Sequence, residues 1–168
     1  MLITKENVGT YREVSKSVRD DKINPHIEDA QYLDLRPLLG ERMYQALVKD
    51  YQEINYAALM EGGEYTFNDN TYYNPGLIKV LSIFAYARYI MMGSYTDTAF
   101  GFVQKSNQDS TPVPESAKRN IHTKERDTAM QYWFEVANFL NRKSTDYPLW
   151  KSGCSTSRPG KFRISKIS

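Results

Sequence analysis

The sequence holds a single cysteine, Cys154, among 168 residues. A lone cysteine excludes an intrachain disulfide and a cysteine-based zinc cage. The two histidines, His26 and His122, lie in no H-E-x-x-H pattern, and the phosphate-binding loops G-x-x-x-x-G-K-[ST] and G-x-G-x-x-G are both missing. We therefore expect no cofactor, no metal ion and no enzymatic activity.

Long apolar runs are also missing. The longest, residues 77–92, is interrupted by Lys79 and Arg88 and falls short of the roughly 20 apolar residues that a membrane span requires. Lys5 and Glu6 stand where a signal peptide would begin its apolar core. We expect a soluble protein that is made in a cytoplasm and has no membrane partner.

Charge of either sign is not in large excess, because 22 basic residues face 20 acidic ones, for a net charge of +2. Overall charge therefore does not indicate a nucleic-acid binder. The charges are unevenly placed, since residues 151–168 carry five basic residues and no acid. This shift predicts a helical domain over residues 1–150 and a basic extended C-terminal arm over residues 151–168.

Apolar residues at helical spacing predict a mainly α fold, a helical bundle of about four to five helices. The segment before residue 23 is polar and predicts an extended N-terminal arm with a short helix. Asn24 and Pro25 are typical of a helix start, and Arg36 before Pro37 predicts its end. The other predicted helices cover residues 41–61 with a kink near residue 53, residues 77–93, and residues 115–141, whose charged first half we expect to project from the core or to meet a partner.

Two polar stretches separate these helices. Residues 66–71 are rich in Asn and Asp and predict a loop. Residues 94–113 predict a long polar loop, a type that is often functional. Within it, Phe100, Gly101 and Phe102 predict a short extended piece. The two rings either insert into an apolar groove of a partner or cap the core of their own domain.

The thirteen tyrosines are the most unusual count in the composition. Tyrosine packs in cores and is enriched at protein interfaces. The polar surroundings of Tyr65, Tyr72 and Tyr73 favour an interface as much as packing, whereas Tyr86, Tyr89 and Tyr95 favour the core.

The C-terminal arm has two interpretations. A flexible solubilising end is the simpler one, whereas Phe162, Arg163 and Ile164 alternate as an added β-strand would. The apolar side chains favour a protein partner over DNA. The candidate partner-binding residues of this arm are Lys151, Arg158, Lys161, Phe162, Arg163, Ile164 and Lys166.

Five sequence strings carry a resemblance to a known family. They are MLITKENV (residues 1–8), YLDLRPLLG (32–40), LMEGGEY (59–65), AYARY (85–89) and TDTAFGFVQK (96–105). Over about residues 1–150 the chain resembles the ring proteins of the head–tail connector, or adaptor, type in crAss-like phages and prophages of gut Bacteroides-type bacteria. Its nearest likeness is to the first ring below the portal.

The resemblance implies an all-α structural virion protein, located in the head–tail connector or tail. It implies a ring, a dodecamer, that docks on the portal protein and meets the next ring or tail protein, with DNA passing through the lumen without sequence-specific binding. The alternative is a small DNA-binding or scaffolding assembly factor without catalytic activity.

Overall fold

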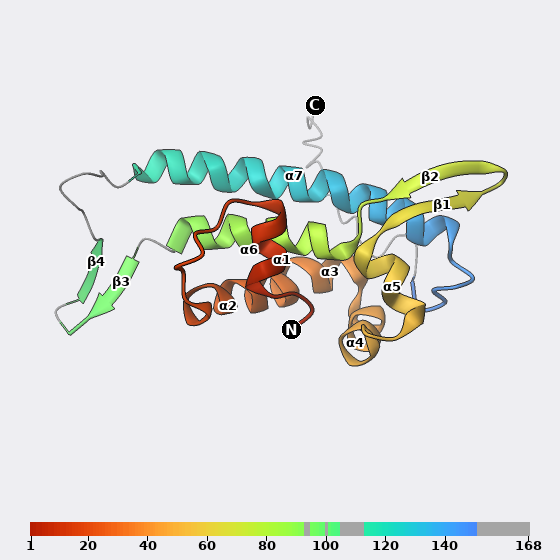
Figure 1. Cartoon of the computed structure of the whole chain (residues 1–168), viewed down its shortest axis with the longest axis horizontal. Helices are drawn as coiled ribbons and strands as arrows, with labels where there is room; N and C mark the ends of the chain where they lie inside the picture. The colour runs from red at the N-terminus through yellow and green to blue at the C-terminus, as the bar shows by residue number, and fades with distance from the viewer. Residues whose placement is uncertain (93–94, 100, 105–112, 151–168) are drawn as a thin grey trace, which may run out of the picture.

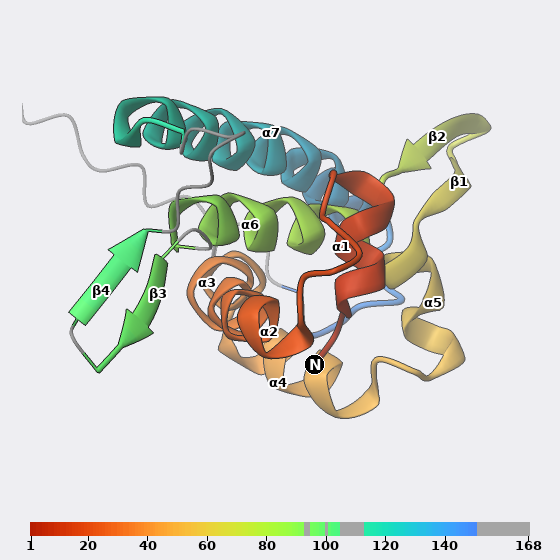
Figure 2. The same ribbon diagram turned by 60° about the vertical axis from the view of Figure 1, so that its left-hand side comes forward.

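The computed structural model describes residues 1–92, 95–99, 101–104 and 113–150, and confirms the mainly α fold. Two long helices, α6 (Leu77–Met92) and α7 (Glu115–Arg142), lie side by side and form the spine of the molecule (Figure 1). Helix α2 (Asp20–Asp29) packs against α6 on the side away from α7, and α1 (Lys5–Tyr11) crosses the flank of α6 (Figures 1 and 2). The core is therefore centred on α6.

Helix α6 starts where the sequence predicts. The buried Asn74 side chain accepts a hydrogen bond from the amide of Gly76 at 3.2 Å and donates one to the carbonyl of Ala58 at 2.8 Å. These bonds fix the turn before the helix, in which Gly76 has a left-handed φ of 81°. Buried residues occur nearly all round its first three turns, so the prediction of a central buried helix is confirmed.

Helix α7 begins and ends as predicted and, at 28 residues, is about 42 Å long. Its buried side includes Trp133, Val136 and Leu140, whereas Ile121 and Phe134, which the spacing placed on the inner face, are exposed. The prediction that its first half projects from the core is wrong, because buried Lys118 and two partnered charged side chains described below tie that half to the body.

The N-terminal segment is part of the core and not an extended arm. The short helix that the sequence predicts is present as α1 (Lys5–Tyr11) and packs on α6. Leu2, Ile3 and Val8 are buried, and the amide of Leu2 donates a hydrogen bond to the side chain of Gln31. Three apolar side chains among polar ones suffice to dock the segment, a pattern too short for a periodicity to reveal.

The prolines do not mark the ends of the next helix, which corrects two predictions. Helix α2 (Asp20–Asp29) begins before Pro25 and continues into η1 (Ala30–Leu35), a π-helical stretch, and α3 (Arg36–Leu39). The wide π turn ends with the amide of Arg36 bonded to the carbonyl of Gln31, which places Pro37 in the first turn of a new helix, where its missing amide hydrogen is tolerated. Residues 38–39, predicted as a turn, are helical.

The segment from residue 41 to residue 61 contains two helices, α4 (Glu41–Asp50) and α5 (Ile54–Glu61), with the predicted break between them. Gly62 ends α5 with a left-handed φ of 80°. A Cβ atom at this position would overlap the backbone oxygen of Asn74. Gly62 is therefore required both by its dihedral angle and by the close approach of the chain.

A β-hairpin replaces the predicted polar loop. Strands β1 (Gly63–Phe67) and β2 (Asn70–Asn74) pair antiparallel in the register Tyr65 to Tyr72. Asn68 and Asp69 connect them with positive φ values of 48° and 62°, the two-residue turn that suits the twist of a hairpin. The Asn and Asp that predicted a loop are the turn itself, and the Tyr and Thr on both sides are strand-forming residues.

A second hairpin lies in the segment predicted as a long polar loop. Strand β3 (Tyr95–Thr98) pairs antiparallel with β4 (Gly101–Gln104), with Asp97 opposite Phe102 and Thr98 opposite Gly101. The prediction of a short extended piece is confirmed for Gly101 and Phe102. This hairpin and the β1–β2 hairpin extend beyond opposite ends of the α6–α7 spine (Figures 1 and 2).

Candidate interaction site

A groove opens at the end of the molecule where α5, β1 and the C-terminal end of α7 meet (Figure 1). Its volume is about 620 Å³. We call it the tyrosine groove. Its lining consists of aromatic rings with polar groups at the margin, namely Asn55, Tyr56, Ala58, Tyr65, Phe139, Lys143, Asp146 and Tyr147.

The aromatic rings of the groove form a continuous chain of contacts. The ring of Phe139 meets that of Tyr65 edge to face at a centroid distance of 4.9 Å and lies 5.7 Å from that of Tyr147. Tyr147 lies 6.2 Å from Tyr56. Such pairs contribute about 0.5–1.5 kcal/mol each beyond the area they bury, so the aromatic side of the groove is held in a fixed arrangement, while Asn55, Lys143 and Asp146 make the rest of its lining polar.

Tyr147 is the buried anchor of this chain of rings. It belongs to the segment after α7, which folds back onto the body and buries both Tyr147 and Trp150. Its hydroxyl donates a hydrogen bond to the carbonyl of Asn55 at 3.2 Å. Burial raises the pKa of Tyr147 to about 12, so the hydroxyl remains protonated and keeps donating.

Tyr72, a candidate interface residue, is half-buried and has its ring in contact with side chains of its own chain. Its ring stacks on Tyr65 at 5.7 Å, and the guanidinium of Arg142 lies 3.8 Å from its centroid. The same guanidinium donates to the Tyr65 hydroxyl at 2.7 Å, which raises the pKa of Arg142. Tyr73 follows on the opposite face of the strand and is 64% exposed, so it is the tyrosine of this pair that a partner can reach.

The same end of the molecule is acidic. Residues 50–78 contain five acidic residues and no Lys or Arg. Glu53, Glu61, Glu64 and Asp69 are exposed, and no ion pair within the described residues involves any of them. We call residues 50–78 the acidic end. Arg142 and Lys143 of the α7 end lie beside these acids and offset part of their charge, and the remaining excess of acid favours a basic partner.

A second group of charges lies inside the molecule and holds the spine together. The Asp34 carboxylate, whose side chain is 2% exposed, accepts two hydrogen bonds from Arg88, at 2.7 and 3.1 Å, and one from Arg126 at 2.7 Å. These residues come from η1, α6 and α7. A further ion pair, Arg12 to Glu125 at 2.6 Å, joins α7 to the end of α1. The Asp34 cluster could not be predicted from the sequence because no local pattern links its members.

The two histidines lie near these charges, and their surroundings lower the pKa of each. Burial, followed by the positive charges of Arg126 and Arg88, lowers the pKa of His122. Burial also lowers the pKa of His26, whose ring lies 5.9 Å from Tyr89 in an edge contact. Tyr86 and Tyr89 are partly buried against the core, as predicted.

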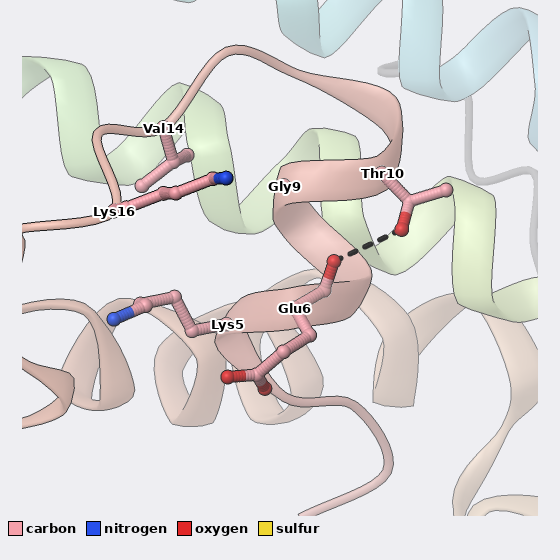
Figure 3. A pocket seen from close by; sticks show the side chains of 6 residues that line it. All are labelled: Lys5, Glu6, Gly9, Thr10, Val14 and Lys16. Atoms are coloured by element: carbon pink, nitrogen blue, oxygen red, sulfur yellow. Dashed lines mark hydrogen bonds between the residues drawn. The ribbon is translucent and has the colours of Figure 1, made fainter.

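A hollow of about 430 Å³ borders α1 and contains two lysines and a glutamate (Figure 3). Lys5 is engaged within the chain, because its ammonium donates to the carbonyl of Val18 at 2.6 Å and lies 3.2 Å from Asp20. Thr10 donates to the backbone oxygen of Glu6 (Figure 3). The hollow lacks buried polar groups that converge on a ligand, so we assign no site to it.

The described residues include no group of three or more His, Cys, Asp or Glu side chains placed to hold a metal ion. None of their helices is long and apolar enough to cross a membrane. Several predicted site residues lie outside the described part of the chain: Phe100, Lys151, Arg158, Lys161, Phe162, Arg163, Ile164 and Lys166. Tyr95 and Phe102 are described as backbone only.

Residues 35–160 match DUF6712, a family of unknown function. The match spans more than half of the chain, so the protein belongs to this family. No curated protein and no solved structure matches the chain.

Proposed function

We propose that the chain is a non-catalytic structural protein of a phage virion. In this proposal its copies form a ring in the head–tail connector, docked on the portal, with DNA passing through the lumen. The observation that carries it is the pair of hairpins extending beyond opposite ends of the α6–α7 spine (Figure 1). The resemblance of five sequence strings to connector ring proteins supports the same function.

Two unlike ends suit a head-to-tail contact. When one end of a subunit binds the other end of its neighbour, the contact is heterologous, and repeated rotation closes it into a ring. The acidic end offers an exposed tyrosine, Tyr73, and a groove, while the opposite end offers the β3–β4 hairpin.

The non-catalytic part of the proposal is supported by how the buried charges are used. An active site needs titratable groups that converge on a cavity. The buried carboxylate of Asp34 is paired with Arg88 and Arg126, and aromatic rings form one side of the tyrosine groove.

The decisive experiment is the native mass of the protein alone and after co-expression with the portal protein. We expect a complex in which many copies accompany one portal ring, with each subunit burying well over the roughly 1,000 Å² of a specific interface. Virions in which copies of the chain do not touch each other would contradict the proposal. Loss of portal binding as salt rises, together with DNA retention on a filter, would favour a DNA-binding assembly factor.

A paired variant tests the β3–β4 end. Replacing both Phe100 and Phe102 by serine is expected to weaken ring assembly while the isolated chain keeps its helical circular dichroism and its unfolding midpoint. The matched control is Phe134→Ser, which makes the same change at an exposed phenylalanine of α7 outside both hairpins and should leave assembly unchanged. Unfolding of the isolated Phe100/Phe102 variant would instead assign both rings to the core of their own domain.

A further inference from the structure

The tyrosine groove lies beside a strand edge that has no partner. Within the described residues β1 pairs only with β2, so its other edge presents unpaired backbone groups. The two faces of β1 differ, because Tyr65 and Phe67 are half-buried on the groove side while Glu64 and Thr66 are exposed on the other. An added strand would find an apolar face and an acidic face here.

The C-terminal segment starts from a fixed point of the body. Trp150 is buried, its ring meets Trp133 at a centroid distance of 6.0 Å, and its indole N–H donates to Asn141 at 2.8 Å. Eighteen residues follow it. Residues 151–160 contain both glycines and the proline of the segment and, extended, span roughly 33 Å. They are long enough to carry residues 161–168 to a neighbouring molecule.

Charge distinguishes the acidic end as the counterpart of this segment. Residues 151–168 have five basic residues and no acid, whereas residues 50–78 have five acidic residues and no base. Opposite charges of this size raise the association rate and fix the orientation of the two surfaces.

Apolar and charged side chains alternate in residues 161–164, as aromatic and polar side chains alternate in β1. Phe162 and Ile164 share one face of an extended strand, and Lys161 and Arg163 share the other. If the added strand places Phe162 and Ile164 on the same face of the sheet as Tyr65 and Phe67, then Lys161 and Arg163 lie on the same face as Glu64. An aromatic side chain then reaches the tyrosine groove while opposite charges pair across the strands.

We propose that residues 161–165 of one copy add as a strand to the β1 edge of a neighbouring copy, with Phe162 in the tyrosine groove. This inference rests on the proposed function, because a donor segment and an acceptor groove on every chain join copies head to tail. It names the contact by which each subunit of the ring holds the next.

Crosslinking in assembled rings tests this contact. In a Cys154→Ser background, Arg163→Cys and Glu64→Cys place two thiols on the same face of the added strand and β1. A bis-maleimide that spans about 8 Å reaches both direct and diagonal neighbours across strands, so the exact register does not matter. The matched control pairs Arg163→Cys with Glu28→Cys, an exposed acid on α2. Circular dichroism and portal binding confirm that both variants fold and assemble.

We expect covalent dimers and higher multiples of the chain from the Glu64 pair, and at least a tenfold smaller yield from the Glu28 pair. Rings that form with the portal but give no such multiples would overturn the inference and leave the proposed function intact. A linked monomer without multiples would place the segment on its own chain and would also overturn it. Failure to form any complex with the portal would overturn the proposed function and this inference together.

Discussion

Replacing Asp34 by asparagine tests whether the buried charge cluster holds the spine together. The carboxylate accepts hydrogen bonds from Arg88 and Arg126 and so connects η1, α6 and α7. Asparagine has the same shape, but it is neutral and one of its two oxygens becomes an amide nitrogen. That nitrogen donates hydrogen bonds and faces arginines that also only donate.

The size of the loss follows from the burial of the three side chains. Removing one partner of a buried ion pair costs about 3–5 kcal/mol, since the other charge is left without compensation. The Asp34 side chain is 2% exposed, whereas those of Arg88 and Arg126 are 22% and 37% exposed and regain contact with water. We therefore expect Asp34→Asn to lower the free energy of unfolding by about 3 kcal/mol, the lower end of this range. For a chain of this size that lowers the unfolding midpoint by about 6–12 °C.

Urea unfolding followed by circular dichroism measures this loss. The matched control is Asp21→Asn, which makes the same chemical change in an exposed pair whose carboxylate contacts Arg19 at 2.7 and 3.0 Å. Exposed ion pairs contribute about 0–1 kcal/mol, so the control should scarcely change the midpoint. Equal losses in the two variants would refute the view that burial makes the Asp34 cluster important.

Three further predictions concern the backbone, the histidines and the groove. Gly62→Ala should lower the free energy of unfolding by at least about 2 kcal/mol, because φ is 80° and the new Cβ would meet backbone atoms. Gly9→Ala, in open space within α1, should instead raise it by about 0.5–1 kcal/mol. Urea unfolding of both variants tests this, and similar midpoints would contradict the reasoning. The folded-state pKa of His26 and of His122 lies below the unfolded value of 6.5, so the unfolded chain binds more protons and stability should fall as the pH drops through about 6.5. Urea midpoints measured at a series of pH values test this, and the His26→Gln/His122→Gln variant should flatten the profile; an unchanged slope would show that other groups cause it. Tyr147→Phe should lower the free energy of unfolding by about 1 kcal/mol, because the hydrogen bond to the carbonyl of Asn55 is lost. It should also reduce the loss of stability between pH 10 and pH 12, to which Tyr44, Tyr56 and Tyr86 contribute as well because burial raises the pKa of each. Thermal unfolding measures this, and an equally steep loss in the variant would contradict the assignment.

Much of the helical part of the fold could be predicted, because a helix repeats its apolar positions every three or four residues within one segment. That local signal predicted α6 and α7 nearly to the residue, and Gly62 predicted the end of α5. The β1–β2 hairpin was missed because its strands are short and rich in polar residues, and the alternation from Glu64 to Phe67 covers only four positions. The path through Pro37 was missed because a π turn, which has no sequence signature, absorbs the proline.

The sequence by itself determined which segments are helical, where the basic segment begins, and that Tyr72 and Tyr73 lie in one candidate interaction region. Only the tertiary structure decided how those residues are used. Asp34 lies 54 positions from Arg88 and 92 from Arg126, and Arg142 lies 77 from Tyr65. Contacts across such separations depend on how whole helices pack, and packing is a property of the complete core, so no local pattern in the chain could have separated the half-buried Tyr72 from the exposed Tyr73.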